Sequence, residues 1–361
     1  MRDGARTTRT AGLRRSVAAA AALFVAACTS GGGGAVGAPA DAATPETTTP
    51  TTAAPTTGAP TTTTTTIPTT VLPEDPTERW QALLAEVGTE LPGGGTEIFP
   101  DRRIVMLYGH PATHRLGILG EYRLDGAIAA VEALAAEFET AGFETEAADA
   151  VPVVPAFEII ATVATRAPGD DEDYSKESTV DELRPWVEAI GEAGGFAVLD
   201  LQPGRTDFVT QARRYEELLR LPYVGLALDP EWRLEPDEVH LRQIGSVSAD
   251  EVNRVVEYLV GLVHEDVLPQ KLLVLHQFQH TMLPDRELIA TPPELAVVLH
   301  VDGQGPLGSK YGTYDEMVTA PMGPGQTLWW GWKNFHDEDS PMATPAQTNA
   351  VEPLPMVVSY Q

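Results

Sequence analysis

The stretch Val224–Trp232 reads VGLALDPEW and joins a buried strand to a turn that carries two acids. Its residues are apolar up to Asp229, as in a strand of a parallel sheet that is covered on both faces. Side chains alternate along a strand, so Asp229 shares a face with Ala227, and the leucines beside Ala227 face the opposite way. Asp229 and Glu231 are therefore predicted to point inward, into the space that the sheet encloses.

Seven other short apolar runs resemble this one and are spaced along the rest of the chain. The eight predicted strands are 104–109, 157–163, 196–202, 224–229, 272–278, 295–302, 328–334 and 356–361. Helical apolar spacing lies before and between them, at 75–87, 127–141, 206–219 and 251–263. Thr179 with Glu182, and Ser248 with Glu251, fit capping boxes at two further helix starts.

This alternation predicts an α/β fold, a (β/α)8 TIM-barrel-like single domain over residues 75–361. A doubly wound open sheet is the alternative, although no G-x-G-x-x-G follows the first strand. The connections 281–293 and 303–325 are rich in Pro and Gly and predict irregular structure. No helix follows the last strand, so helix 75–87 is expected to fill the eighth helix position, with Gln361 near the catalytic face.

The first 74 residues predict export and anchoring. Arginines followed by the apolar run 16–27 are typical of a signal peptide over residues 1–27. Cys28, the only cysteine, ends a small-residue box that resembles the lipobox of bacterial lipoproteins. Acylation there, by palmitate or a similar chain, predicts a protein held on the extracytoplasmic side of the cell membrane. Residues 28–74, rich in Gly and then in Thr and Pro, predict a disordered stalk.

Charge excludes one class of partner. The chain has 52 acidic and 24 basic residues, a net charge of −28, and without residues 1–27 the charge becomes −32. Nucleic-acid binding needs clustered Lys and Arg, so it is excluded. The single cysteine excludes an internal disulfide, a zinc ribbon and an iron–sulfur site. We expect a monomer whose partners are the lipid bilayer and a carbohydrate or other small molecule, and we expect no cofactor.

Catalytic residues of such barrels lie at the carboxyl ends of strands. Glycoside hydrolysis needs one protonated carboxyl as acid and a second, ionised carboxyl. Glu231 is the candidate acid, and its candidate partners are Asp229, Asp200 and Asp302. Candidate substrate-binding residues, several of them aromatic and suited to stacking on sugars, are Tyr108, His110, Trp232, His276, Gln277, Trp330, Trp332 and Lys333.

Two other functions stay open. A metal-dependent hydrolase would draw its ligands from His110, His276, His300, Asp302 and Asp229, although no tight ligand motif is present. A non-catalytic lipoprotein that binds carbohydrate or another envelope component would use the same pocket. One feature weakens the glycosidase hypothesis: retaining barrels commonly place a carboxyl on strand seven, which here carries Lys333 and Asn334. His110 and His114 also fit a purely structural role in their loop.

An ordered set of motifs resembles a family of uncharacterised bacterial secreted lipoproteins. The motifs are Tyr108–Pro111 (YGHP), Leu116–Glu121 (LGILGE), Leu228–Trp232 (LDPEW), Ile244-Gly245, Leu275–Phe278 (LHQF), His300–Gly303 (HVDG) and the terminal Ser-Tyr-Gln. The resemblance runs from about Arg103 to Gln361. It implies an exported barrel and leaves the reaction open.

Overall fold

The computed structural model describes residues 72–144 and 151–361. The predicted signal peptide, Cys28 and almost all of the stalk lie outside these residues. None of the described helices is both long and apolar enough to cross a membrane. The strands are β1 (Arg103–Gly109), β2 (Val153–Ala164), β3 (Ser175–Glu177), β4 (Phe196–Leu201), β5 (Val224–Leu228), β6 (Lys271–Gln277), β7 (Leu295–Val301), β8 (Trp329–Asn334) and β9 (Val357–Tyr360).

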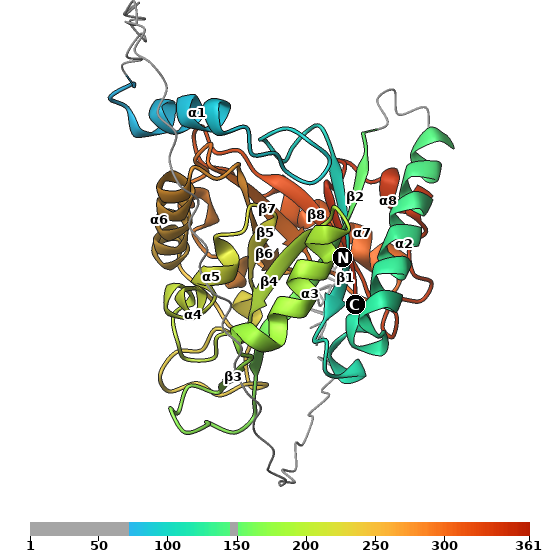
Figure 1. Ribbon diagram of the computed structural model, residues 1–361. Helices are drawn as coiled ribbons and strands as arrows, with labels where there is room; N and C mark the ends of the chain where they lie inside the picture. Colours follow the sequence, from blue (N-terminus) through green and yellow to red (C-terminus); the bar gives the residue numbers. More distant parts are fainter. Residues whose placement is uncertain (1–71, 145–150) are drawn as a thin grey trace, which may run out of the picture.

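Eight of these strands form a closed parallel barrel (Figure 1). They pair in the order β1-β9-β8-β7-β6-β5-β4-β2, and the pairing of β1 with β2 closes the ring. The (β/α)8 prediction is confirmed, and each of the eight predicted strands is present. Sequence reasoning missed β3, a short strand that pairs antiparallel with the end of β2 and extends it beyond the barrel rim.

The helices are α1 (Pro76–Val87), α2 (Leu124–Glu144), α3 (Val180–Glu192), α4 (Phe208–Arg214), α5 (Glu216–Leu219), α6 (Ala249–Asp266), α7 (Leu307–Thr319) and α8 (Pro345–Asn349). The prediction of irregular structure over 303–325 was wrong for α7. This glycine-containing segment is helical because tertiary contacts hold it in place. Lys310 is buried and donates to the backbone oxygen of Lys333 and to Asp339.

One predicted capping box forms in full and the other in part. Thr179 and Glu182 bond reciprocally at the start of α3. At the start of α6, Ser248 accepts a hydrogen bond from the Glu251 amide, but the Glu251 carboxylate binds Arg233 and the Phe208 amide instead. The carboxylate thus joins α6 to the preceding loops, a role that local spacing does not reveal.

The helix predicted at 75–87 is present as α1, but its predicted place in the barrel was wrong. Helix α1 packs on α6 through Trp80 and Leu84, and the Trp80 indole donates to the Leu268 backbone oxygen at 2.7 Å. Leu268 immediately precedes β6, so α1 lies at the amino-terminal end of the barrel, opposite β3 in Figure 1. The outer face of β9 is covered by α2, where the rings of Phe138 and Tyr360 are 6.3 Å apart.

Alternation along the strands divides the apolar core into two layers. The outer layer lies between barrel and helices and includes Leu226 and Leu228. The inner layer fills the barrel and includes Ala227 and Val198, with Phe99 closing the amino-terminal end. The predicted orientation of the β5 side chains is confirmed. Above this inner layer, toward the carboxyl ends of the strands, the inward-facing residues become polar.

Candidate active site

Inward-facing polar side chains from seven different strands meet in the carboxyl-terminal half of the barrel. Six of them occupy the last inward position of their strand, and the seventh, Glu158 on the longer strand β2, is in register with Tyr108 on β1. These residues are Tyr108, Glu158, Asp200, His276, His300, Lys333 and Ser359, all of them buried. Asp229, Glu231 and Asp302, which directly follow β5 and β7, lie just above them.

His276 lies between two carboxylates. Its Nδ1 is 2.7 Å from Asp302 Oδ2, and its Nε2 is 2.9 Å from Glu158 Oε1. Burial lowers the pKa of His276, but the charges of Asp302 and Glu158 outweigh it and raise that pKa well above its ordinary value. In the protein as described, the imidazole is therefore a cation that donates to both acids.

Lys333 is the second buried cation. Its Nζ lies 3.3 Å from Asp302 Oδ2 and 3.9 Å from the centre of the Tyr108 ring. Burial raises the pKa of Asp302, yet His276 and Lys333 lower it well below the usual range. Asp302 is thus the strongly ionised carboxylate of the cluster, and its side chain is 10% exposed.

The pKa values of Asp200 and Asp229 are raised, unlike that of Asp302. Burial raises the pKa of Asp200 to about 6, and it raises that of Asp229 well above its ordinary value. Asp200 accepts a hydrogen bond from the Tyr108 hydroxyl at 2.9 Å. Asp229 Oδ1 accepts from the Glu231 amide at 3.1 Å and so caps the short turn that carries Glu231.

Glu231 lies at the rim of the cluster and is partly exposed. Burial, and then the negative charge of Asp302, raise the pKa of Glu231 to about 7. A residue outside the cluster holds the backbone of Glu231, because the Gly245 amide donates to the Glu231 backbone oxygen at 2.8 Å. A Cβ at position 245 would come within 2.3 Å of the Pro230 oxygen, so only glycine permits this approach.

His300 is the neutral histidine of the cluster. Burial lowers its pKa to about 4, and its Nε2 lies 2.7 Å from Ser359 Oγ. The ring lies over Gly331, where a Cβ would be 2.0 Å from His300 Nδ1. Gly331 thus provides the space that the imidazole occupies.

Two predicted tryptophans face away from this site. Trp332 is buried in the outer layer against Tyr314, and Trp330 packs on the same layer. Side chains alternate along a strand, and Lys333 faces inward. Trp332 and Trp330, which lie one and three residues before Lys333, therefore face the helices. Their expected stacking on a substrate therefore has no support in this placement.

Other predicted residues are nearby but differ in role. Gln277, next to the inward His276, faces outward and accepts from Arg286 at 3.1 Å. His110 bonds Ser178 and the amide of Ala112 and so shapes its loop. Trp232 follows Glu231, is half-buried, and lies 5.4 Å from the ring of His240.

Sequence reasoning missed Glu158. It lies within the apolar run FEIIATV and is fully buried. A carboxylate among apolar residues of a central strand is itself the signal that could have identified it, since such a charge must have a buried partner.

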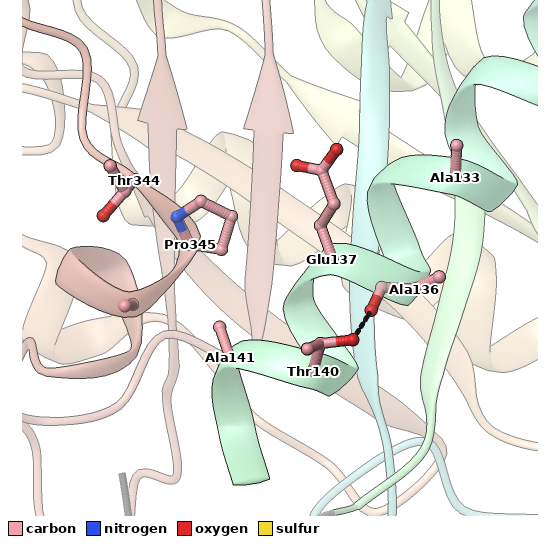
Figure 2. Close-up of a pocket in the computed structure, with 8 residues that line it drawn as sticks. Ala133, Ala136, Glu137, Thr140, Ala141, Thr344 and Pro345 are labelled. Atoms are coloured by element: carbon pink, nitrogen blue, oxygen red, sulfur yellow. Dashed lines mark hydrogen bonds between the residues drawn. The ribbon is translucent and has the colours of Figure 1, made fainter. Parts of the chain in front are cut away.

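The predicted acids, His276 and Lys333 lie together in one cluster, and most of this cluster is closed to solvent. Asp200, Asp229, His276 and Lys333 are buried, and only Glu231 and Asp302 are partly exposed. A cavity of about 410 Å³ lies instead between α2 and α8 (Figure 2), where Glu137 is the only ionisable lining residue. Another, of about 420 Å³, lies among the loops above the barrel and is lined in part by Tyr174 and His240.

Among residues 72–144 and 151–361, two groups of side chains have donor atoms close enough to hold a metal ion. One is His276, His300 and Asp302, whose ligand atoms lie within 4.8 Å of one another. The other is the surface cluster Asp171, Asp173 and Glu177. In that second cluster Asp173 already bonds the Ser175 amide and Thr206.

Comparison with models of known protein families finds no match, and comparison with curated protein sequences finds no similar protein. The assignment of a reaction therefore depends on the chemistry of this cluster.

Proposed function

We propose that the barrel is a hydrolase that acts on a carbohydrate at the carboxyl-terminal mouth. The observation that carries the proposal is Glu231, a partly exposed carboxyl whose pKa is raised to about 7. Such a group holds a proton near neutral pH and can release it to a leaving oxygen. It stands beside an ionised carboxylate, Asp302, which is paired with Lys333 and His276.

The proposed reaction uses these two acids in opposite roles. Glu231 donates its proton to the leaving oxygen as the glycosidic C–O bond breaks. Water attacks the sugar carbon from the side of Asp302, and the proton of that water passes to the Asp302 carboxylate. Asp302 then releases its proton to solvent and Glu231 takes one up from solvent, which restores both groups. Lys333 and His276 keep Asp302 ionised and in place.

Aromatic residues above the barrel suit a carbohydrate. Trp232 follows the proposed acid, and its partner His240 lines the cavity of about 420 Å³ together with Tyr174. Aromatic faces and polar edges are the usual lining of sugar sites. A chain bound across Glu231 would extend over Trp232 toward this cavity.

We also propose that the enzyme works at the cell surface. The signal sequence, the lone Cys28 and the Thr/Pro-rich stalk support a lipid-anchored monomer facing the extracytoplasmic side. The substrate would then be a carbohydrate of the envelope or the environment.

A screen of envelope and environmental glycans tests the reaction. We expect the wild type to release reducing ends from one class, and Glu231→Gln to lose at least about a hundredfold of that rate. Glu235→Gln, an exposed acid of the same loop, is the matched control and should retain activity. Equal rates for Glu231→Gln and wild type would refute the assignment.

A second candidate function is binding without catalysis, which the burial of Asp200 and His276 favours. It predicts that a glycan is retained by the wild type and released unchanged after long incubation. Glu231→Gln would then bind as the wild type does.

A further inference from the structure

We propose that His276, His300 and Asp302 form a binding site for one divalent transition-metal ion, such as Zn²⁺. The inference deepens the proposed function and rests on it for the use of the ion, though not for the existence of the site. In this arrangement the ion, rather than the Asp302 carboxylate alone, activates the attacking water.

The three donors are brought together by neighbouring strands. His276 on β6 is in register with His300 on β7, and Asp302 follows on the same inward side. The two imidazole rings are 5.3 Å apart and perpendicular, and the three ligand atoms lie within 4.8 Å of one another. Two imidazoles and a carboxylate are a common ligand set of catalytic zinc, which keeps one position open.

The outer partners of the histidines match those of metal ligands. His276 Nε2 is held by Glu158 at 2.9 Å, and His300 Nε2 by Ser359 at 2.7 Å. A ligating histidine commonly uses its second nitrogen in this way, which sets the ring orientation. His300 Nδ1 has no hydrogen-bond partner among the described residues, and His276 Nδ1 faces Asp302, the third proposed ligand, at 2.7 Å.

Unsatisfied atoms point to the same conclusion. His300 Nδ1 and Asp302 Oδ1 are buried and have no hydrogen-bond partner among the described residues. Buried polar atoms of this kind are rare, because leaving them unpaired costs about 1–3 kcal/mol each. A cation bound to both would satisfy them together.

The contacts already present in the cluster do not block the site. Lys333 and His276 both bind Oδ2 of Asp302, which leaves Oδ1 free. The ion would replace the proton between His276 Nδ1 and Asp302.

Direct binding of metal to the protein tests the site. The purified protein is freed of metal with a chelator and titrated with Zn²⁺ and with Co²⁺, by calorimetry and by visible absorption. We expect one ion per chain at the site, and a loss of affinity of at least about tenfold in Asp302→Asn and in His300→Gln. His110→Gln, a histidine outside the cluster, and Asp171→Asn, in the surface acidic group, should bind as the wild type does.

A result from the wild type alone is also decisive if a variant fails to fold. Proton NMR of the Co²⁺ form should show two strongly shifted imidazole N–H signals, one for each ligating histidine. The inference is overturned if neither ion binds, if Asp302→Asn binds as tightly as wild type, or if no such signals appear.

The metal inference and the proposed reaction can fail separately. Glycan hydrolysis that persists in chelated protein and is lost in Glu231→Gln would support the reaction and overturn the role of the ion in it, while the titration alone decides whether the site exists. Metal binding lost in Asp302→Asn, without hydrolysis of any glycan, would support the site and contradict the reaction.

Discussion

At the scale of single residues, the interior of this barrel is governed by the pairing of buried charge. Glu158, His276 and Asp302 form a row in which each charge has an opposite neighbour within 3 Å. Removing one partner of such a row leaves a buried charge uncompensated, at a cost of about 3–5 kcal/mol. The same burial that makes pairing necessary raises the pKa of Glu231, which forms no ion pair with any of the described residues.

Gly331 supplies a test at this scale. In Gly331→Ala the new methyl would meet His300 Nδ1, so the ring must move and its bond to Ser359 must break. We expect a loss of about 1–3 kcal/mol in the free energy of unfolding, measured with urea. Gly261→Ala, on α6 with no atom within 4 Å, is the control and should gain about 0.5–1 kcal/mol. Equal stability of Gly331→Ala and wild type would mean that His300 does not need this space.

At the scale of elements, the strands form the barrel, and buried polar side chains attach the loops and helices between the strands to it. Arg286 holds the loop after β6 to α7 by donating to the backbone oxygens of Met317 and Ala320. Lys271, the first residue of β6, similarly donates to the backbone oxygens of Leu221 and Val224. These side chains satisfy carbonyl groups that regular structure leaves unpaired.

Lys271 predicts a pH dependence of stability. Burial lowers its pKa from 10.5 to about 7. Between these values the unfolded chain binds a proton that the native protein does not, so the free energy of unfolding rises with pH. Urea titrations from about pH 7 to about pH 10 should show a smaller rise for Lys271→Met than for wild type. Parallel curves for the two proteins would contradict the lowered pKa.

At the scale of the whole molecule, one barrel carries a large excess of negative charge. Acids outnumber bases 52 to 24, and several ion pairs, such as those of Arg220 with Glu216, Glu265 and Asp266, are on the surface. Surface pairs of this kind add little stability. Repulsion among the unpaired acids therefore acts on the folded protein as a whole.

This charge predicts stabilisation by salt. Added NaCl screens the repulsion, with a Debye length that falls from about 30 Å at 0.01 M to about 3 Å at 1 M. We expect the midpoint of thermal unfolding to rise over this range, measured by circular dichroism. Sucrose at matched osmolality is the control for general exclusion effects. An unchanged or lower midpoint in salt would show that repulsion is not limiting.

The strand pattern alone predicted the barrel because apolar runs and side-chain alternation are local properties. It also oriented Asp229 correctly, since direction within a strand follows from position. It did not exclude Trp330 and Trp332 from the site, although the same alternation applied to β8 separates them from Lys333. The position of α1 depended on packing against α6, which no local signal contains.

The sequence by itself determined the eight strands and the strongly negative net charge. Only the tertiary structure decided which acids are ionised. Glu158 meets His276 across the barrel from a strand far away in the chain, and Asp302 meets it from the end of the neighbouring strand. Glu231 forms no ion pair within the part of the chain that the structure describes. A pKa depends on burial and on nearby charge, and both are set by the closed barrel rather than by neighbours in sequence.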